Sequence, residues 1–268
     1  LELERLANHT GDLGAIAGDT GFLPTASWNG RIRGDFLNTT ACLCGNRFGR
    51  GLLRPGGTAY DLDTDGCADM LARLKAAGRD VRGAVDVMLH TESVLERLTG
   101  TGYVSRESAQ NLGLVGMAAR ACGLKVDARF HFPLADLPTR DCAPRVETTG
   151  DVLARTLVRS KEIDDSLRLL VADISTLASL PPLAEQPDAE ALASLPPDTL
   201  AVSQVEGWRG EICHVAVTGP DGRFLTYKAI DPSFHNWPGL AMALRGNQIS
   251  DFPLCNKSFN LSYCGHDL

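Results

Sequence analysis

The C-terminal stretch SFNLSYCGHDL contains the residues best suited to bind a metal ion. Cys264 and His266 lie within it, and Cys255 precedes Cys264 by nine residues. Thiolate and imidazole groups are common zinc ligands, so these three residues and one more ligand could hold a zinc ion. The nine-residue step and the short step that follows it fit no common zinc module. The alternative is a set of buried thiols beside a polar C-terminus.

A second candidate is the arginine in the segment VEGWRGEICHVAV. This segment places Glu206 and Arg209 on a tight turn that precedes a predicted strand. An arginine beside a glycine can direct its guanidinium group into a cleft, where its fork of N–H donors binds a polar group. The alternative is a loop arginine that closes a salt bridge.

Three other segments carry polar groups at turns. Asp19, in GDT, lies in an apolar stretch, where a carboxylate must either pair or titrate upward and carry a proton. Arg54 begins RPGG, a turn that lacks the length and the lysine of a phosphate-binding loop. In DPSFHNWP, Asn236 or Ser233 could cap the following helix, and His235 is expected to be structural.

Helices must position most of these residues, because apolar side chains recur at helical spacing in three long segments. Gly78 and Gly83 weaken the second segment, so it is expected to be two helices or one bent helix. Between the second and third segments, a short helix and then an irregular stretch are expected. The three long segments are residues 1–18, 65–98 and 151–177, the short helix is expected over 105–113, and the irregular stretch covers 114–130.

The periodicity changes after a Pro-rich surface connection. Three short strands are then predicted over 200–205, 212–218 and 224–230, with a turn at TGPDGR, and a short helix follows over 237–244. The expected fold is mainly α (α+β), a helical bundle with a small antiparallel sheet near the C-terminus. Its parts are the bundle (1–180), the connection (181–198), and the sheet with a C-terminal helix and tail (199–268).

Composition excludes several classes of function. With 44% hydrophobic and 22% charged residues, the 268-residue chain has the composition of a soluble globular protein. A net charge of −7 without a basic run argues against nucleic-acid binding. No apolar stretch approaches the ~18 residues that cross a bilayer. The eight cysteines are sparse and irregular, which favours reduced thiols in a cytosolic compartment.

The order of the motifs resembles one family over nearly the whole chain. LELERLANH, GDTGF, RPGG, the segment from YVSRESAQ to KVDAR, GDVLARTLVRSKEIDDSLR and the segment from VEGWRGE to HNWPGL occur in sequence. Together they resemble the large subunit of membrane-associated nickel–iron hydrogenases and the homologous 49-kDa-type subunit of respiratory complex I, and most closely the formate hydrogenlyase type. The chain opens in the middle of a helix without a starting Met, and we expect it to be a C-terminal fragment of such a subunit.

The resemblance implies where a nickel–iron centre would be held. Two thiolates of that centre come from an upstream C-x2-C motif, and two come from a C-terminal D-P-C-x2-C motif. Here Ser262 and Gly265 stand at the two C-terminal positions, and Cys264 is one residue out of register. Because nickel needs soft, deprotonated sulfur ligands, we expect no family-type nickel binding.

The resemblance also implies roles for single residues. Arg209 matches the arginine that overhangs the hydrogenase site, and Asp19 matches an aspartate of a proton and quinone relay in the complex I branch. We expect these two residues and Glu206 to form the catalytic set. We expect four charged residues to bind a cofactor. Three match a charged loop of the family near the small-subunit interface, namely Arg120, Asp127 and Arg129, and the fourth is Arg54 of the RPGG turn.

The function implied by the resemblance is that of an oxidoreductase subunit in an NADH-quinone oxidoreductase or formate hydrogenlyase-like complex. The expected site is a quinone-type or vestigial cleft, with no cofactor bound by the fragment itself. The expected partners are an iron–sulfur small subunit and membrane subunits, at the cytoplasmic face of the membrane. Two alternatives remain: a working hydrogenase with altered ligands, and a non-catalytic assembly scaffold.

Overall fold

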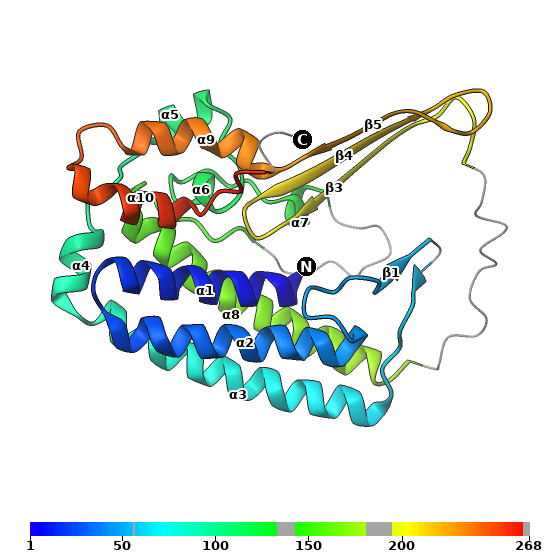
Figure 1. Ribbon diagram of the computed structural model, residues 1–268, viewed down its shortest axis with the longest axis horizontal. Coiled ribbons are helices and arrows are strands. Elements are labelled where there is room, and N and C mark those ends of the chain that lie inside the picture. The colour runs from blue at the N-terminus through cyan, green and yellow to red at the C-terminus, as the bar shows by residue number, and fades with distance from the viewer. Residues whose placement is uncertain (56, 133–142, 181–194, 265–268) are drawn as a thin grey trace.

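The computed structural model describes residues 1–55, 57–132, 143–180 and 195–264. Four long helices run side by side as a bundle, and a three-stranded antiparallel sheet extends away from them (Figure 1). The predicted fold class is therefore confirmed. The bundle helices are α1 (Glu2–Asp19), α2 (Leu23–Cys44), α3 (Thr64–Leu89) and α8 (Val152–Leu177).

The long helices form where an N-cap is followed by apolar residues at helical spacing. Asp63 begins α3 by accepting a hydrogen bond from the backbone N–H of Gly66 at 2.7 Å. Asp151 begins α8 in the same way. Capping by aspartate satisfies an N–H group that has no partner inside the helix. The apolar faces of the four helices then meet in one buried core.

The sequence analysis did not predict α2, because the side that this helix buries is partly polar. Thr25 and Asn29 are buried there together with Ile32 and Phe36. Gly14 of α1 lies against this side, where an added Cβ would approach the Cβ of Asn29 to 3.0 Å. Glycine in α1 thus lets the two helices pack closely although α2 lacks an unbroken apolar stripe.

The predicted segment 65–98 is two helices, and the break lies C-terminal to both glycines. The second helix, α4 (Glu92–Leu98), begins after His90 and Thr91. Gly78 remains inside α3 and faces α8, where an added Cβ would lie 2.9 Å from Cδ1 of Leu167. This glycine therefore sets the close approach of α3 and α8 instead of breaking the helix.

Shorter helices cover the N-terminal half of α8 and enclose a second apolar core. The stretch predicted to be irregular contains two short helices, and α10 was not predicted. Asp231 caps α9 by accepting from the backbone N–H of Ser233 at 2.7 Å, so α9 begins earlier than the predicted helix. The elements are α5 (Arg106–Asn111), α6 (Gly116–Arg120), α7 (Ala128–His131), α9 (Pro232–Ala243), η1 (Ile249–Asp251) and α10 (Phe252–Phe259).

The three predicted strands are confirmed as β3 (Leu200–Glu206), β4 (Glu211–Thr218) and β5 (Phe224–Ile230). They pair antiparallel in the order β3-β4-β5, with Leu200 opposite Val217. A separate hairpin of β1 (Leu53–Arg54) and β2 (Gly57–Thr58) forms at RPGG. Most of the predicted Pro-rich connection, residues 181–194, lies outside the described residues. Among the described helices, none is both long and apolar enough to cross a membrane.

Candidate functional site

Arg209 lies on the turn between β3 and β4, which rests on the start of α6. An added Cβ on Gly116 would be only 2.2 Å from the Cα of Gly210, so two glycines allow the turn to touch α6. The guanidinium group of Arg209 lies 3.8 Å from the centre of the Trp208 ring, and its Nε donates to the carbonyl of Asn260. The turn therefore holds Arg209 against the C-terminal tail.

The tail follows α10 and is fixed by a second arginine. Arg159 of α8 is fully buried and donates to the carbonyl oxygens of Ser258 and Phe259 at 2.6 and 3.3 Å. These carbonyls belong to the last turn of α10, where backbone acceptors have no partner inside the helix. Asn260 ends α10 in a left-handed conformation with φ of 48°. The arginine thus satisfies the helix end and positions the tail.

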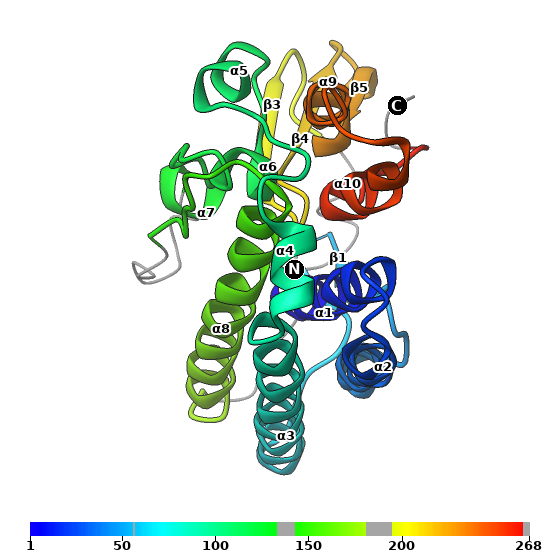
Figure 2. The ribbon, with the colours of Figure 1, turned by 90° about the vertical axis from the view of Figure 1, so that its left-hand side faces the viewer.

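Asp12 of α1 joins these groups into one site. Its carboxylate accepts from Nε of Arg159 at 2.9 Å and from the side-chain amide of Asn260. Figure 2 shows α1 between α2 and α10, which brings Asp12 close to the tail. We call Asp12, Arg159, Arg209 and Asn260 the tail site.

The tail site carries more positive than negative charge. Among its members, the two guanidinium groups of Arg159 and Arg209 accompany one carboxylate, that of Asp12, and Asp231 is a second carboxylate that acts on Arg209 from outside the site. Burial lowers the pKa of Arg209, while Asp12 and Asp231 oppose this effect. Arg155, also fully buried, donates to Ser258 Oγ and, in the described part of the chain, otherwise only to backbone carbonyls. Burial lowers its pKa to about 10. Such a surrounding favours a ligand that is anionic or gains negative charge.

The residues at the expected metal positions form no metal site in the described part of the chain. Ser262 Oγ lies 3.5 Å from Sγ of Cys264, and Cys264 is exposed. Cys255 is fully buried in α10. Within the ranges that the structure describes, no group of three His, Cys, Asp or Glu residues could hold a metal ion. Gly265 and His266 lie outside those ranges.

A larger group of buried charges lies next to the tail site. Glu162 of α8 is its centre, with Nε of Arg120 at 2.7 Å and Nε2 of His9 at 2.9 Å. On its other side Arg120 donates from Nη1 to Glu206 at 2.7 Å. We call the whole group the arginine–carboxylate cluster. Its members are Glu2, Arg5, His9, Arg120, Asp127, Arg129, Glu162 and Glu206.

Most charges of this cluster hold one another ionised. The carboxylates of Glu162, Glu206 and Asp127 raise the pKa of Arg120, although burial lowers it. For Glu2, burial raises the pKa and the neighbouring arginines lower it, and the net result is a pKa of about 2. Paired and hydrogen-bonded charges of this kind are expensive to separate.

The structure brings together most of the residues singled out in the sequence, but not all. Arg120, Asp127, Arg129 and Glu206 belong to one cluster, and Glu206 and Arg209 flank one turn. Arg54 is exposed on the β1–β2 hairpin, and no described hydrogen bond or ion pair joins it to that cluster.

Asp19 lies elsewhere than its sequence suggested. The expected apolar surrounding was wrong, because Asp19 is exposed at the C-terminal end of α1. Partial desolvation still raises its pKa, and Lys257 of α10 opposes the rise. The buried aspartate near the tail is Asp12, about 10 Å away along the helix at 1.5 Å per residue. A role for Asp19 in a proton relay stays a prediction.

Sequence reasoning missed the polar stripes of α1 and α8. In α1 the ionisable residues Glu2, Arg5, His9 and Asp12 follow one another at steps of three or four. In α8 the same spacing joins Arg155, Arg159, Glu162 and Ser166. Such a stripe is typical of a solvated helix face. Here both stripes are buried and face each other. The complementary signs of their charges were the one sequence signal that could have indicated this pairing.

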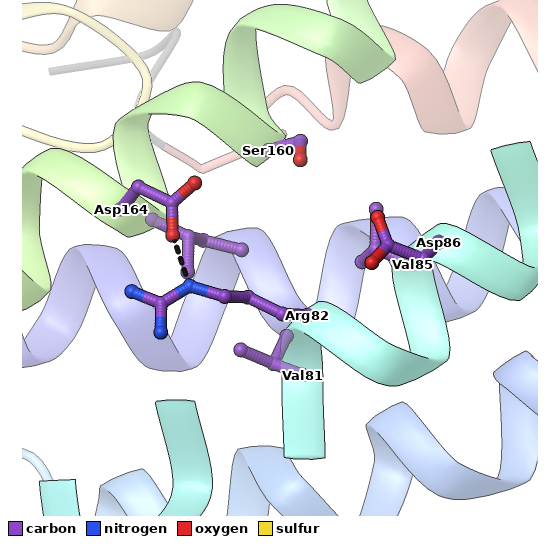
Figure 3. Close-up of a pocket in the computed structure, with 7 residues that line it drawn as sticks. Val81, Arg82, Val85, Asp86, Ser160 and Asp164 are labelled. Carbon is purple, nitrogen blue, oxygen red and sulfur yellow. Dashed lines mark hydrogen bonds and ion pairs between the residues drawn. The ribbon is translucent and has the colours of Figure 1, made fainter. Parts of the chain in front are cut away.

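A separate hollow of about 110 Å³ lies between α3 and α8 (Figure 3). Arg82 of α3 donates across it to Asp164 of α8 at 2.6 Å. Both side chains are half exposed, and no residue of the tail site or the arginine–carboxylate cluster lines the hollow. It therefore contributes nothing to either site.

Comparisons with known proteins agree with the resemblance seen in the motifs. The chain is 30% identical over 267 residues to hydrogenase-4 component G of Escherichia coli, covering 98% of this chain and 43% of that protein. It is 29% identical to formate hydrogenlyase subunit 5 of the same organism, covering 98% of this chain and 45% of the relative. One of the NADH-quinone oxidoreductase subunits of Symbiobacterium thermophilum is 28% identical, covering 94% of this chain and 68% of that relative.

A solved structure and a family match complete the comparison. A chain of the membrane-bound sulfane sulfur reductase, an archaeal respiratory membrane complex, superposes with a TM-score of 0.85 at 23% identity, covering all of this chain and 73% of that one. This likeness confirms the fold. The chain spans less than half the length of the first two relatives. Residues 19–267 match the family described as respiratory-chain NADH dehydrogenase, 49 Kd subunit, and the chain belongs to this family.

Proposed function

We propose that this chain is part of the large subunit of a membrane-associated oxidoreductase complex, and that its tail site forms one wall of a cleft for a quinone-type electron acceptor. The relatives are named as subunits of NADH-quinone oxidoreductases and hydrogenases, which supports the reaction class. The observation that carries the proposal is the set of three arginines around the tail, Arg155, Arg159 and Arg209, of which the first two are fully buried and the third donates to the carbonyl of Asn260.

The chemistry of an acceptor explains why such a site would be useful. A quinone gains electrons before or together with protons, so its oxygen atoms become negatively charged. Fixed N–H donors and cations stabilise charge that develops during a reaction, because they need no reorganisation. Arg209 supplies such donors, and the bonds of Asp12 to Arg159 and Asn260 keep the tail in place below it.

We also propose that this chain holds no family-type nickel–iron centre. At one expected thiolate position stands Ser262, whose hydroxyl group is a poor ligand for nickel. Cys264 offers a thiol, but Cys255 is enclosed in the second apolar core and cannot join it without opening α10. The donor set of the described tail therefore does not fit the centre, and no reaction step is assigned to it.

A working hydrogenase with altered ligands is the second candidate, favoured by the hydrogenase names of the relatives. Metal analysis of the full-length protein in its assembled complex separates the two functions. We expect less than stoichiometric nickel. One nickel and one iron per chain would overturn the first proposal in favour of the second.

Quinone-dependent turnover of the assembled complex tests the site itself. We expect Arg209→Ala to abolish most turnover, Arg209→Lys to restore only part, and Asp19→Asn to lower it through the proposed relay. Arg223→Ala is the matched control, because Arg223 is an exposed arginine on the turn of β4 and β5. Full turnover of the Arg209→Ala complex would instead support a non-catalytic scaffold.

We also infer the partners of this chain and its place in the complex. The relatives and the structural neighbour are subunits of multi-subunit membrane complexes, which supports other complex subunits as partners. We infer an iron–sulfur small subunit among them, and a position on the cytoplasmic side of the membrane subunits. Purification of the tagged chain from its native membrane should recover an iron–sulfur protein, and recovery of the chain alone would contradict this assembly.

A further inference from the structure

The arginine–carboxylate cluster contains an unequal number of opposite charges. Three guanidinium groups, those of Arg5, Arg120 and Arg129, face four carboxylates. The most exposed of these side chains is Arg129, at 17%. Arg159, a further cation that acts on His9, already pairs with Asp12 at 2.9 Å. An uncompensated negative charge in a buried site is costly, so the cluster favours binding one proton.

His9 is a poor place for that proton. Its Nε2 lies 2.9 Å from Glu162, but in the described part of the chain its buried Nδ1 has no hydrogen-bond partner. Protonation would turn Nδ1 into a buried donor without an acceptor. Burial, Arg159 and Arg5 lower the pKa of His9, and Glu162 alone opposes them. His9 is therefore neutral and donates from Nε2 to Glu162.

Glu162 and Glu2 are also poor places, because several donors stabilise their ionised forms. Glu162 accepts hydrogen bonds from Arg120 and His9, and its carboxylate lies 3.5 Å from Nη1 of Arg5. Glu2 accepts hydrogen bonds from Arg5, from Arg129 and, at 2.6 Å, from the hydroxyl group of Ser166. A carboxylate that accepts two or three such bonds keeps a low pKa.

Asp127 and Glu206 remain, and they compete for one guanidinium nitrogen. Nη1 of Arg120 lies 2.7 Å from Oε1 of Glu206 and 3.5 Å from Oδ2 of Asp127. Asp127 has its own cation, since Arg129 donates to both of its oxygens at 3.0 and 2.7 Å. Apart from Arg120, Glu206 accepts one described hydrogen bond, from the neutral backbone N–H of Ala128 at 2.9 Å. Of two like charges at one site, the less well paired one takes the proton.

We propose that Glu206 and Asp127 share one proton at neutral pH, held mainly on Glu206, and that they form an internal proton-binding site behind the Arg209 turn. The cations that act on this pair are Arg5 of α1, Arg120 of α6 and Arg129 of α7. Two further carboxylates lie on the neighbouring elements: Glu162 of α8, which shares Arg120 with Glu206, and Glu211 of β4, the register partner of Glu206. Burial and the charge of Asp127 raise the pKa of Glu206, against Arg120 and Arg5. Burial also raises the pKa of Asp127, but Arg129 and Arg120 outweigh it.

The location of this site ties the proton to the tail site. Arg5 donates to the backbone carbonyls of Glu206 and Gly207, at 2.8 and 3.1 Å, and so holds the first residues of the turn that carries Arg209. A change in the charge of Glu206 therefore acts on both Arg120 and the strand end that precedes Arg209. The inference goes beyond the proposed function, because it holds for any ligand of the tail site.

Infrared spectroscopy of the chain at neutral pH tests the proposal, because a protonated carboxyl group has a C=O stretching band distinct from that of a carboxylate. We expect one such band from a buried group. Carbon-13 labelling of glutamate carboxyl groups should shift it, and labelling of aspartate should not. Isotopes leave folding unchanged, so this result stands even where a variant is unstable. Absence of the band, or a shift with aspartate labelling alone, would overturn the proposal.

Two variants and a control complete the experiment. Glu206→Gln should remove the band and keep the thermal stability at neutral pH, since the amide resembles the protonated acid. Asp127→Asn should also remove it, because Glu206 would then have Arg120 to itself and ionise. Glu147→Gln, a variant of a carboxylate that pairs with Lys161 outside the cluster, should leave it unchanged. Persistence of the band in Glu206→Gln, or nitrogen-15 NMR showing His9 as an imidazolium at neutral pH, would place the proton elsewhere and refute the assignment.

Discussion

Replacing Arg159 by methionine tests whether buried ion pairs hold the tail of this protein in place. Arg159 is fully buried and has the same kind of bond to an aspartate as the exposed Arg82, at 2.9 Å to Asp12 and 2.6 Å to Asp164 respectively. Geometry is thus similar in the two pairs and burial differs. The comparison contrasts a buried arginine–aspartate pair that also bonds the end of α10 with an exposed pair that has no such bonds in the described part of the chain.

The expected magnitudes differ by several-fold. Arg159→Met leaves the carboxylate of Asp12, only 4% exposed, without its cation, and it removes donors from two carbonyls at the end of α10. Loss of one partner of a buried pair costs about 3–5 kcal/mol. Arg82→Met removes a pair whose side chains are both 52% exposed, and such pairs contribute roughly 0–1 kcal/mol.

Urea denaturation of the purified chain measures both changes. The double variant Arg159→Met with Asp12→Asn removes the isolated buried charge, and we expect it to recover about 2 kcal/mol relative to Arg159→Met alone. The reasoning fails if Arg159→Met costs no more than Arg82→Met, or if the double variant is as unstable as Arg159→Met.

Three further predictions follow from other features. The pKa of Glu2 falls from 4.5 to about 2 on folding, so its ionised form stabilises the fold above pH 4.5. This contribution, about 3 kcal/mol, is lost as the pH falls from 4.5 toward 2. The Glu2→Gln variant should therefore be less stable at pH 7, and urea denaturation should show that its stability depends less on pH between 4.5 and 2. Gly116 has a φ of +62° and touches Gly210, so Gly116→Ala should destabilise the chain by roughly 1–3 kcal/mol and move the indole signal of Trp208 in an NMR spectrum, whereas Gly83→Ala, in open space on α3, should do neither. Cys264 is exposed, while Cys255 is buried and burial raises its pKa. A thiol reagent should therefore label Cys264 in the folded chain and Cys255 only after denaturation. Equal labelling rates at the two cysteines would contradict the packing of α10.

Several elements followed directly from local sequence. The strands over 200–206, 211–218 and 224–230 are short β-rich runs separated by glycine-containing turns, and their pattern depends only on neighbours in the chain. Helices α1, α3 and α8 carry regular apolar stripes and were predicted for the same reason. By contrast α2 and α10 were missed. The buried side of α2 includes Thr25 and Asn29, and its packing depends on glycines in another helix.

The candidate site was predictable only in part. Arg209 could be recognised from its turn, because glycines beside an arginine are a local signal. Arg120, Asp127, Arg129 and Glu206 could be recognised by resemblance to a family, but nothing local indicated that they form one buried cluster. Asp19 was singled out from its apolar neighbours and its match to a family aspartate, and Asp12 was not considered, because neighbouring residues do not show which face of the helix becomes buried.

The amino-acid sequence by itself therefore determined the fold class, the three-stranded sheet, the family and the chemical character of the tail, since hydroxyl and thiol groups at 262 and 264 are properties of single residues. Only the tertiary structure decided which charges are buried and which partners they meet. Arg159 reaches Asp12 across 147 positions of the chain, and Arg5 reaches Glu206 across 201. The energy of a charge depends on its burial and its partners, and both are set when distant helices pack together.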